Sequence, residues 1–313
     1  MIIQVMNAPD LALPSTAAGL NGATLLTEAG VIRAAGDDAA TFLQGQLTQD
    51  IVLMKAGESR LAALCNPKGR MLASFVVLKH AEDDILLICS RDLVAAMQKR
   101  LSMFVLRAKV RLTDASEQFT LHGLIGETAT NAQDAVPAGA SVCPLMPADG
   151  APRALLVAPA EAPPLPAPPL DAALWRWADA RSGVAMVTEP IKEAFVPQML
   201  NYESIGGVNF KKGCYPGQEV VARSQFRGAI KRRAFVAQVD GPAEAGQEVF
   251  SPADAEQPCG TIAVAAPAPG GGTVVIASLQ LAALKGIEVL NLGAADGPSM
   301  TGWHIPYELL EDI

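Results

Sequence analysis

The order in which apolar patterns follow one another is the feature that most limits how this chain can fold. Alternating or continuous apolar runs predict strands at 24–34, 60–65, 71–79, 84–89 and 105–112. Helices are predicted at 36–51 and after Asp92. The resulting order β-α-β-β-β-α-β is typical of an α+β fold and does not fit a doubly wound parallel sheet.

Acidic residues stand where both of these helices are expected to begin. Asp37 or Asp38 can accept hydrogen bonds from the first free N–H groups of the first helix. Asp92 can do the same for the second helix, in which apolar residues recur at helical spacing from Leu93 to Phe104. We therefore expect both helices to be capped by carboxylates.

A proline-rich stretch divides the chain. Nine of the 27 residues at 144–170 are Pro, which fixes φ and removes backbone donors, so loops or a semi-rigid linker are expected there. A helix is predicted at 171–183, closed by a glycine. Short apolar segments punctuated by Gly and Pro then predict a small β-barrel. We expect an N-terminal module of two α+β subdomains at 1–229 and a C-terminal β-barrel domain at 230–313.

Composition limits the class of protein. Of 313 residues, 50% are hydrophobic and 18% are charged, which fits two or three folded domains and not a wholly disordered chain. No apolar run approaches about 18 residues, so no transmembrane helix is expected. No Lys or Arg precedes Arg33, and the pattern of a signal peptide is absent. A cytoplasmic protein without a membrane partner is the expectation.

Cysteine and histidine are few and scattered. The five Cys have no CxxC spacing, and the three His form no cluster with zinc-like spacing. Neither a disulfide framework nor a metal site is therefore expected.

Positive charge is concentrated in one segment. The net charge is −8, yet residues 211–233 hold seven bases and one acid, so this segment is +6 and the rest of the chain is −14. Its charges alternate with Gly, Pro, Tyr and Cys, which favours a binding site for an anion over a merely solvated face. A second basic stretch, 91–112, is equally well explained by a solvated face.

Common catalytic signatures are absent. The chain has no GxSxG, GxxxxGK[ST], HExxH or GxGxxG pattern. The usual hydrolase, nucleotide-binding and metalloprotease interpretations lose their support.

Cys214 is the candidate functional thiol. It follows two lysines and precedes the turn Pro216–Gly217, and nearby positive charge stabilises a thiolate. Arg223 and Arg227 farther on can bind carboxylates or phosphates in bidentate geometry. An isolated Cys is more often structural, and the residues alone leave both interpretations open.

The segment KKGCYPGQEVVAR, residues 211–223, resembles the signature of the folate-binding YgfZ family, relatives of the glycine-cleavage T-protein. The resemblance extends to the FRG and KR that follow, and to 36–51, 65–71 and 195–213. It covers roughly residues 25–233 and, more weakly, the ending HIPYELLE.

This resemblance implies a T-protein-like body of interleaved α+β subdomains around a central channel, with a C-terminal β-barrel. It implies that the channel binds tetrahydrofolate or a derivative. Members of the family support the maturation or repair of iron–sulphur enzymes, including one that thiomethylates tRNA. The implied link to tRNA is therefore indirect, and a monomer is the expected state.

Individual positions of the family motif match residues of this sequence. The family's cysteine matches Cys214. The motif neighbours taken as candidate catalytic residues are Lys212, Tyr215, Gln218 and Glu219. Cys65, in the turn CNPKGR, is a candidate neighbour of the thiol in space.

The resemblance also suggests which residues bind folate. A folate-contacting tryptophan of the family matches Trp175, eight residues before Gly183, and its indole could stack on a pteridine or aminobenzoyl ring. The other interpretation of Trp175 is a core residue. The remaining candidates for cofactor binding are Arg181, Lys68, Arg223 and Arg227.

Aminomethyl transfer, the reaction of the T-protein, is not expected. The T-protein has an acidic pair after a Gly-rich turn, and the matching positions here fall at about Ala73 and Ser74. Neither side chain can act as a carboxylate, so the transition state would lose its charge partner.

Three functional hypotheses follow. The first is a tetrahydrofolate-binding accessory protein for iron–sulphur enzymes and tRNA modification, with Cys214 as its thiol. The second is a folate-dependent aminomethyltransferase, which the residues at 73–74 disfavour. The third is a scaffold that binds RNA or protein through the basic segment 211–233.

Overall fold

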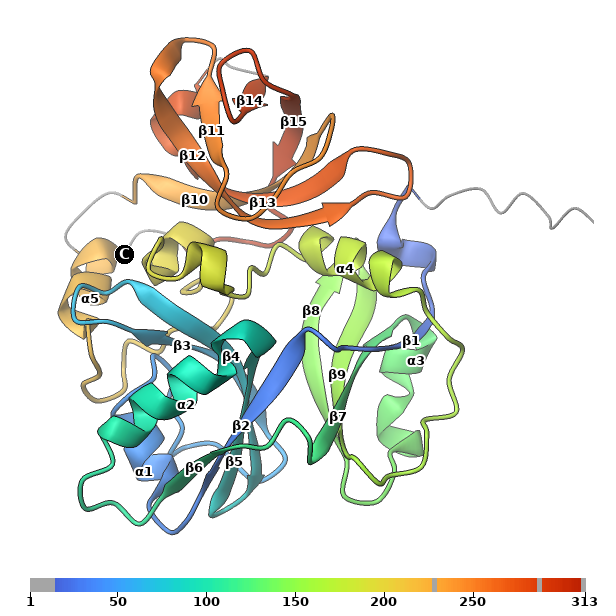
Figure 1. Ribbon diagram of the computed structural model, residues 1–313, viewed down its shortest axis with the longest axis vertical. Coiled ribbons are helices and arrows are strands. Elements are labelled where there is room, and N and C mark those ends of the chain that lie inside the picture. Colours follow the sequence, from blue (N-terminus) through green and yellow to red (C-terminus); the bar gives the residue numbers. More distant parts are fainter. Residues whose placement is uncertain (1–14, 227–229, 286–288, 311–313) are drawn as a thin grey trace, which may run out of the picture.

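Two antiparallel sheets and a closed barrel make up the structure, a computed structural model that describes residues 15–226, 230–285 and 289–310 (Figure 1). None of the described helices is long and apolar enough to cross a membrane. The α+β fold expected from the order of apolar patterns is confirmed, and the C-terminal strands close into the expected barrel.

The larger sheet is apolar on both faces. Its strands, in the order β3-β4-β5-β2-β6, are β2 (Ala29–Ala35), β3 (Ser59–Cys65), β4 (Met71–Ala81), β5 (Asp84–Ser90) and β6 (Arg111–Asp114). Helices α1 (Ala39–Gln44) and α2 (Val94–Met103) pack on one face through buried apolar side chains. The other face packs on the second sheet, which explains why β4 reads as a continuous apolar run.

The smaller sheet contains one strand that precedes the larger sheet along the chain and three strands that follow it. Its strands, in the order β1-β7-β9-β8, are β1 (Gly22–Leu25), β7 (Phe119–Ile125), β8 (Ser141–Ala148) and β9 (Ala151–Pro159). The short helix α3 (Glu127–Thr130) follows β7. Because β1 lies in this sheet, β2–β6 build the larger one and β7–β9 return to the smaller one, the two α+β subdomains are interleaved as expected.

The barrel lies above both sheets in Figure 1. Its strands, in the order β10-β13-β12-β11-β14-β15, are β10 (Arg232–Val239), β11 (Glu248–Ser251), β12 (Asp254–Pro267), β13 (Thr273–Gln280), β14 (Leu290–Leu292) and β15 (Ser299–His304). Helix α4 (Ala172–Arg181) packs between the smaller sheet and the barrel, and α5 (Gln218–Phe226) precedes β10.

The segment after the barrel returns to the body. The hydroxyl of Tyr307 donates to the carbonyl of Gly183 over 2.9 Å. Gly183 has φ +73, and a Cβ there would lie 2.7 Å from Pro306. This explains in packing terms why a glycine ends α4, and it ties the C-terminal segment to the start of the 184–188 loop.

The strand predicted at 24–34 is two strands in different sheets. The break falls at 26–28, where the chain crosses from β1 to β2. Residues 26–28 are Leu-Thr-Glu, with no Gly or Pro, so the sequence carries no turn signal at this crossing. The strand predicted at 105–112 is also shorter, because pairing with β2 begins only at Arg111.

The predicted helix caps are wrong. The first helix spans only Ala39–Gln44, and Asp38, at its N-cap position, makes no side-chain cap. Its carboxylate instead accepts from the backbone N–H of Lys109 over 2.7 Å. Asp92 accepts from the N–H of Glu189 over 2.9 Å, so both acids join segments far apart in sequence.

Half of the proline-rich stretch 144–170 is strand rather than linker. Most of β8 and all of β9 lie within it, and only 160–170 connects β9 to α4. Sheet structure tolerates these prolines because β8 is an edge strand, and because Pro152 and Pro159 lie near the ends of β9.

Candidate functional site

A cavity of about 480 Å³ lies where the two sheets meet the barrel. Its walls come from the β1–β2 crossing, β3, β5, the β8–β9 hairpin, α4, the 184–188 loop and β12. Most of the lining is apolar, and the polar and charged side chains that share it are Thr27, Glu28, Ser59, Arg60, Ser90, Arg153, Arg176, Asp179 and Thr188. An apolar cavity with a few polar groups is typical of a small-molecule site.

Arg153 is the most buried charge in this cavity. Its side chain is 1% exposed, and its guanidinium pairs with the carboxylate of Asp179 on α4. A second nitrogen donates to the carbonyl of Met146 over 3.1 Å, while Nε has no partner among the described residues. A buried charge with an unused donor is poised to bind an acceptor on a ligand.

Trp175 lines the cavity, and its ring packs against protein atoms. The guanidinium carbon of Arg153 lies 4.4 Å from the ring centroid. A Cβ at Gly123 would lie only 2.4 Å from the indole, so the β7 backbone also approaches the ring closely. Asp171 caps α4 by accepting from the N–H of Ala173 over 2.7 Å, which fixes the helix that carries the indole. The expected stacking of a ligand on Trp175 stays a prediction.

Thr188 supplies a second unpartnered polar atom. Its Oγ1 is buried in the cavity wall and has no hydrogen-bond partner in the described structure. A buried hydroxyl left unpaired costs about 1–3 kcal/mol. Together with Nε of Arg153, it gives the cavity two polar atoms whose bonds a ligand could complete.

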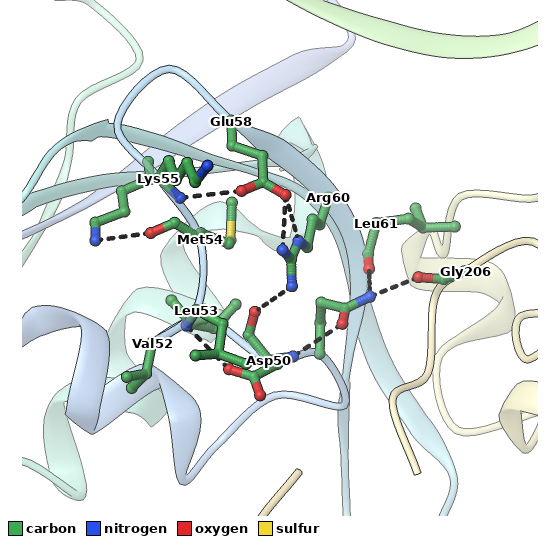
Figure 2. Close-up of polar contacts among 12 residues, drawn as sticks. Asp50, Val52, Leu53, Met54, Lys55, Glu58, Arg60, Leu61 and Gly206 are labelled. Atoms are coloured by element: carbon green, nitrogen blue, oxygen red, sulfur yellow. Dashed lines mark hydrogen bonds and ion pairs between the residues drawn. The ribbon is translucent and has the colours of Figure 1, made fainter. Parts of the chain in front are cut away.

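Arg60 of β3 also lines the cavity, and Figure 2 shows the network of polar contacts that holds it. Two of its nitrogens donate to Oε1 of Glu58, over 2.8 and 2.7 Å, and a third donates to the carbonyl of Asp50 over 3.0 Å. The N–H of Lys55 and then Arg60 hold the pKa of Glu58 below its ordinary value, against the opposing effect of burial. The guanidinium is therefore held in place and retains N–H groups for a ligand.

A second ion pair on the cavity wall, Arg176–Glu28, is more exposed than the pair of Arg153 with Asp179. Arg176 on α4 and Glu28 in the β1–β2 crossing lie 3.2 Å apart, with 44% and 70% of their side chains exposed. Such a pair is weakly held, so a charged ligand group can displace it.

Arg181 does not line the cavity. It pairs with Asp149, and its guanidinium carbon lies 5.2 Å from the Trp177 ring. Burial raises the pKa of Asp149, but hydrogen bonds from Arg181, Ala17 and Thr16 outweigh it and leave the pKa below its ordinary value. The structure thus gives Arg181 a packing role between α4 and the β8–β9 turn.

The candidate thiol lies on a different part of the surface. Cys214 is exposed, and no residue of 211–223 lines the cavity. Its loop packs on the turn at 66–70, where a Cβ at Gly217 would lie 2.4 Å from the carbonyl of Asn66. The structure therefore joins two segments that carry the resemblance but are far apart in sequence.

Lys212 is buried beside this loop. Its Nζ donates to the carbonyl of Leu47 over 2.7 Å and to that of Gln44, at the end of α1. The ammonium also lies 4.9 Å from the ring centroid of Tyr215. Burial lowers the pKa of Lys212 to about 8. The contacts of Lys212 thus fix α1 to the thiol loop.

The other motif residues lie on or near α5. Tyr215 is buried, and burial raises its pKa, with Cys65 close enough to add to this effect. Gln218 begins α5, and the exposed pair Glu219–Arg223 follows at i,i+4 spacing. Arg227 lies outside the described residues.

The charges of 211–233 do not form one exposed basic strip. Lys212 is buried, and Arg233 is buried in a pair with Glu203. Only some of the seven bases can meet a partner in solution, which weakens the RNA-scaffold hypothesis.

Ala73 and Ser74, at the expected positions of the acidic pair, are fully buried and do not line the cavity. The hydroxyl of Ser74 accepts from the N–H of Val187 over 2.7 Å. It therefore anchors the 184–188 loop. Nowhere in the described ranges do three or more His, Cys, Asp or Glu gather as metal ligands would.

Sequence reasoning placed Trp175 in the cavity and missed the polar residues around it. Arg153, Asp179, Arg60 and Thr188 come from four separate segments. The one available signal was Arg153, a charged residue directly before the apolar run ALLVA at 154–158. Lys68 does not line the cavity that holds Trp175; it lines a second basin, at the turn between β3 and β4.

Comparisons with known proteins agree on one family. The GCVT N-terminal domain family matches residues 16–140. A tRNA-modifying protein YgfZ from Edwardsiella ictaluri is 32% identical over 224 residues, 65% of this chain and 67% of that protein. A protein of the same name from Hamiltonella defensa is 32% identical over 256 residues, 75% of each chain. An uncharacterized protein of Haemophilus influenzae is 31% identical over 232 residues, 72% of this chain and 76% of its own.

A solved structure has the same fold. The glycine cleavage system aminomethyltransferase T from Bartonella henselae matches with a TM-score of 0.60 at 16% identity, covering 91% of this chain and 86% of that chain. At this identity the likeness concerns the fold alone, and it confirms the T-protein-like body predicted from the sequence.

Proposed function

The chain belongs to the YgfZ family, and from this premise we propose that it is a tetrahydrofolate-binding accessory protein that supports tRNA modification. Two relatives are named tRNA-modifying proteins, and the T-protein fold is associated with folate in general. The proposal places the ligand in the cavity between the sheets and the barrel.

The observation that carries the proposal is the pair of unpartnered atoms in the cavity wall. Nε of Arg153 and Oγ1 of Thr188 are buried without hydrogen bonds, among the described residues, in the wall of a mostly apolar cavity. Buried polar groups are nearly always paired in a working state, so a ligand with its own polar edge is the natural partner. A flat heterocycle with an anionic tail fits a cavity of about 480 Å³.

The remaining charges fit the two ends of such a ligand. The carboxylate of Asp179 can accept N–H groups of a pteridine ring, beside the donor on Arg153. The guanidinium groups of Arg60 and Arg176 can hold the carboxylates of a glutamate tail. Bound tetrahydrofolate would supply nitrogens that carry one-carbon units, while these side chains bind and orient it.

The proposal gives Cys214 the role of a thiol that acts on a partner. It is the exposed cysteine in a chain whose other four are buried, and it sits in the motif shared with the family. The partner class implied by the resemblance is iron–sulphur enzymes, among them one that thiomethylates tRNA. A thiol outside the cavity leaves ligand binding and partner contact on separate surfaces.

Calorimetric titration with tetrahydrofolate under anaerobic, reducing conditions tests the ligand. Wild type should bind saturably, and Asp179→Asn should weaken binding about tenfold because a charged acceptor is lost. Asp171→Asn is the matched control on the same helix, since Asn caps as well as Asp. Absence of saturable binding to wild type would overturn the folate proposal.

Complementation tests the thiol. In a bacterial strain lacking its own family member, wild type should restore thiomethylated tRNA nucleosides, measured by mass spectrometry. Cys214→Ala should not restore them, whereas Cys143→Ala, which changes a buried thiol, should. Full restoration by Cys214→Ala would remove the thiol from the proposal.

A further inference from the structure

A second basin lies at the turn between β3 and β4. It is lined by Asn66, Pro67, Lys68, Arg70, Arg100, Glu193 and Ala194, and its volume is about 780 Å³. Three of these side chains are cationic and one is anionic. It shares no lining residue with the cavity that holds Trp175.

The cations of this basin lack carboxylate partners. No ion pair among the described residues involves Lys68, Arg70 or Arg100. The one acid, Glu193, already accepts a hydrogen bond from the side-chain amide of Asn66 over 2.9 Å. Three cations against one carboxylate leave the basin with an excess of positive charge.

A fourth cation strengthens this imbalance. Arg232, at the start of β10, lies near enough to Arg70 for the two charges to repel. Burial lowers the pKa of Arg232 and Arg70 lowers it further, although Cys259 opposes this. Guanidinium groups that crowd without an acid between them are stabilised by a bound anion.

The backbone of this turn and the guanidinium of Arg70 are held in place before any ligand arrives. Oδ1 of Asn66 accepts from the backbone N–H groups of Lys68 and Arg70, over 2.9 and 3.0 Å. Gly69 has φ +72, and a Cβ there would lie 3.0 Å from Val220 of α5. One nitrogen of Arg70 also donates to the carbonyl of Ala194. A rigid turn costs less entropy to engage than a loop that must order on binding.

We propose that this basin binds a soluble small molecule carrying at least two negative charges, held by Lys68, Arg70 and Arg100 through phosphate or carboxylate oxygens. Arginine forks match both kinds of oxygen, and the volume exceeds that of a lone anion. The site is additional to the folate cavity, and because the thiol loop packs on the same turn, it adjoins the surface that carries Cys214.

Calorimetric titrations with inorganic pyrophosphate and with citrate, at constant ionic strength and without folate, test this site. At least one of the two should bind wild type saturably. The double variant Lys68→Gln/Arg100→Gln should weaken that binding at least about tenfold. Lys99→Gln, an exposed lysine of α2 outside the basin, should leave it unchanged.

Two further results decide the proposal. Asp179→Asn should keep the wild-type affinity for the anion, because Asp179 lines the folate cavity and not the basin. Loss of folate binding and loss of anion binding can therefore be told apart. The double variant should stay folded, with only a small fall in melting temperature, since neither side chain makes an ion pair among the described residues and the contact of Arg100 with the Phe104 ring lies at the surface. Absence of saturable binding by both probes, or equal binding by wild type and a folded double variant, would overturn it.

Discussion

The guanidinium carbon of Arg153 lies 4.4 Å from the centroid of the Trp175 ring, and the same guanidinium pairs with Asp179 one turn farther along α4. Strand β9 and helix α4 are thus joined inside the cavity by an ion pair and a cation–π contact. Trp175 was a candidate binding residue from the sequence alone, whereas Arg153, which holds its indole in place, was not.

Replacing Arg153 should loosen this wall. Arg153→Met removes the cation–π contact and leaves Asp179 without its partner, so the free energy of unfolding should fall by about 2 kcal/mol. Arg176→Met, which breaks only an exposed pair on the same helix, should cost less than about 1 kcal/mol. Unfolding in urea, an uncharged denaturant that does not screen ion pairs, measures both, and equal losses would contradict the buried role of Arg153.

The contact between the thiol loop and the 66–70 turn should depend on one glycine. Gly217 has φ +79, and its Cβ would meet the carbonyl of Asn66 at 2.4 Å, so Gly217→Ala should destabilise the fold by about 2 kcal/mol. Gly213→Ala is the matched control in the same loop, because no atom lies within 4 Å of its Cβ position. Thermal unfolding of the two variants compares them; similar melting temperatures would mean that the loop does not pack on the turn.

One thiol should react in the native protein. Cys214 is exposed, whereas burial raises the pKa of Cys65 and of Cys89 to about 12, that of Cys143 to about 11, and that of Cys259 above its ordinary value. Iodoacetamide at about pH 8 should therefore label Cys214 alone, as read by peptide mass spectrometry, because the thiolate is the reactive form. Denaturant should expose all five thiols. Rapid labelling of a second site without denaturant would show that a buried cysteine is accessible.

The free energy of unfolding should rise with pH as Lys212 loses its proton. Its pKa falls from 10.5 to about 8 on folding, so between these values the unfolded chain binds more protons than the folded one. The free energy of unfolding should gain about 1 kcal/mol between about pH 7.5 and about pH 9.

The control for that titration is Lys212→Met. This variant should be less stable overall, because the carbonyls of Gln44 and Leu47 lose their donor, and it should lack the pH-dependent gain. An identical pH slope in wild type and variant would assign the effect to another group.

Much of the fold is predictable from local patterns. The strands at 60–65, 71–79 and 84–89 match β3, β4 and β5 closely, because apolar runs bounded by turn residues leave few alternatives. The break between β1 and β2 is not predictable in this way, since no turn residue marks 26–28 and only the separate sheets define it. Strand β8 is not predictable either, because its prolines are typical of loops. An edge strand tolerates them, since its outer N–H groups need no partner in the sheet.

The site is predictable only in part. The motif around Cys214 and the turn at 66–70 are recognisable in sequence, but their packing through Gly217 is a long-range contact. The cavity depends on side chains from segments as distant as Arg60 and Thr188, whose approach no local pattern encodes. Asp38 and Asp92 show the same limit, because both acids look like caps and serve instead to join distant loops.

A crystal structure of the protein grown with saturating tetrahydrofolate tests the central claim most directly. The account predicts the folate ring in the cavity between the sheets and the barrel, with polar atoms bonded to Arg153 and Thr188 and the tail toward Arg60 or Arg176. A folate bound elsewhere, or a cavity that stays closed to it at saturation, would contradict the account.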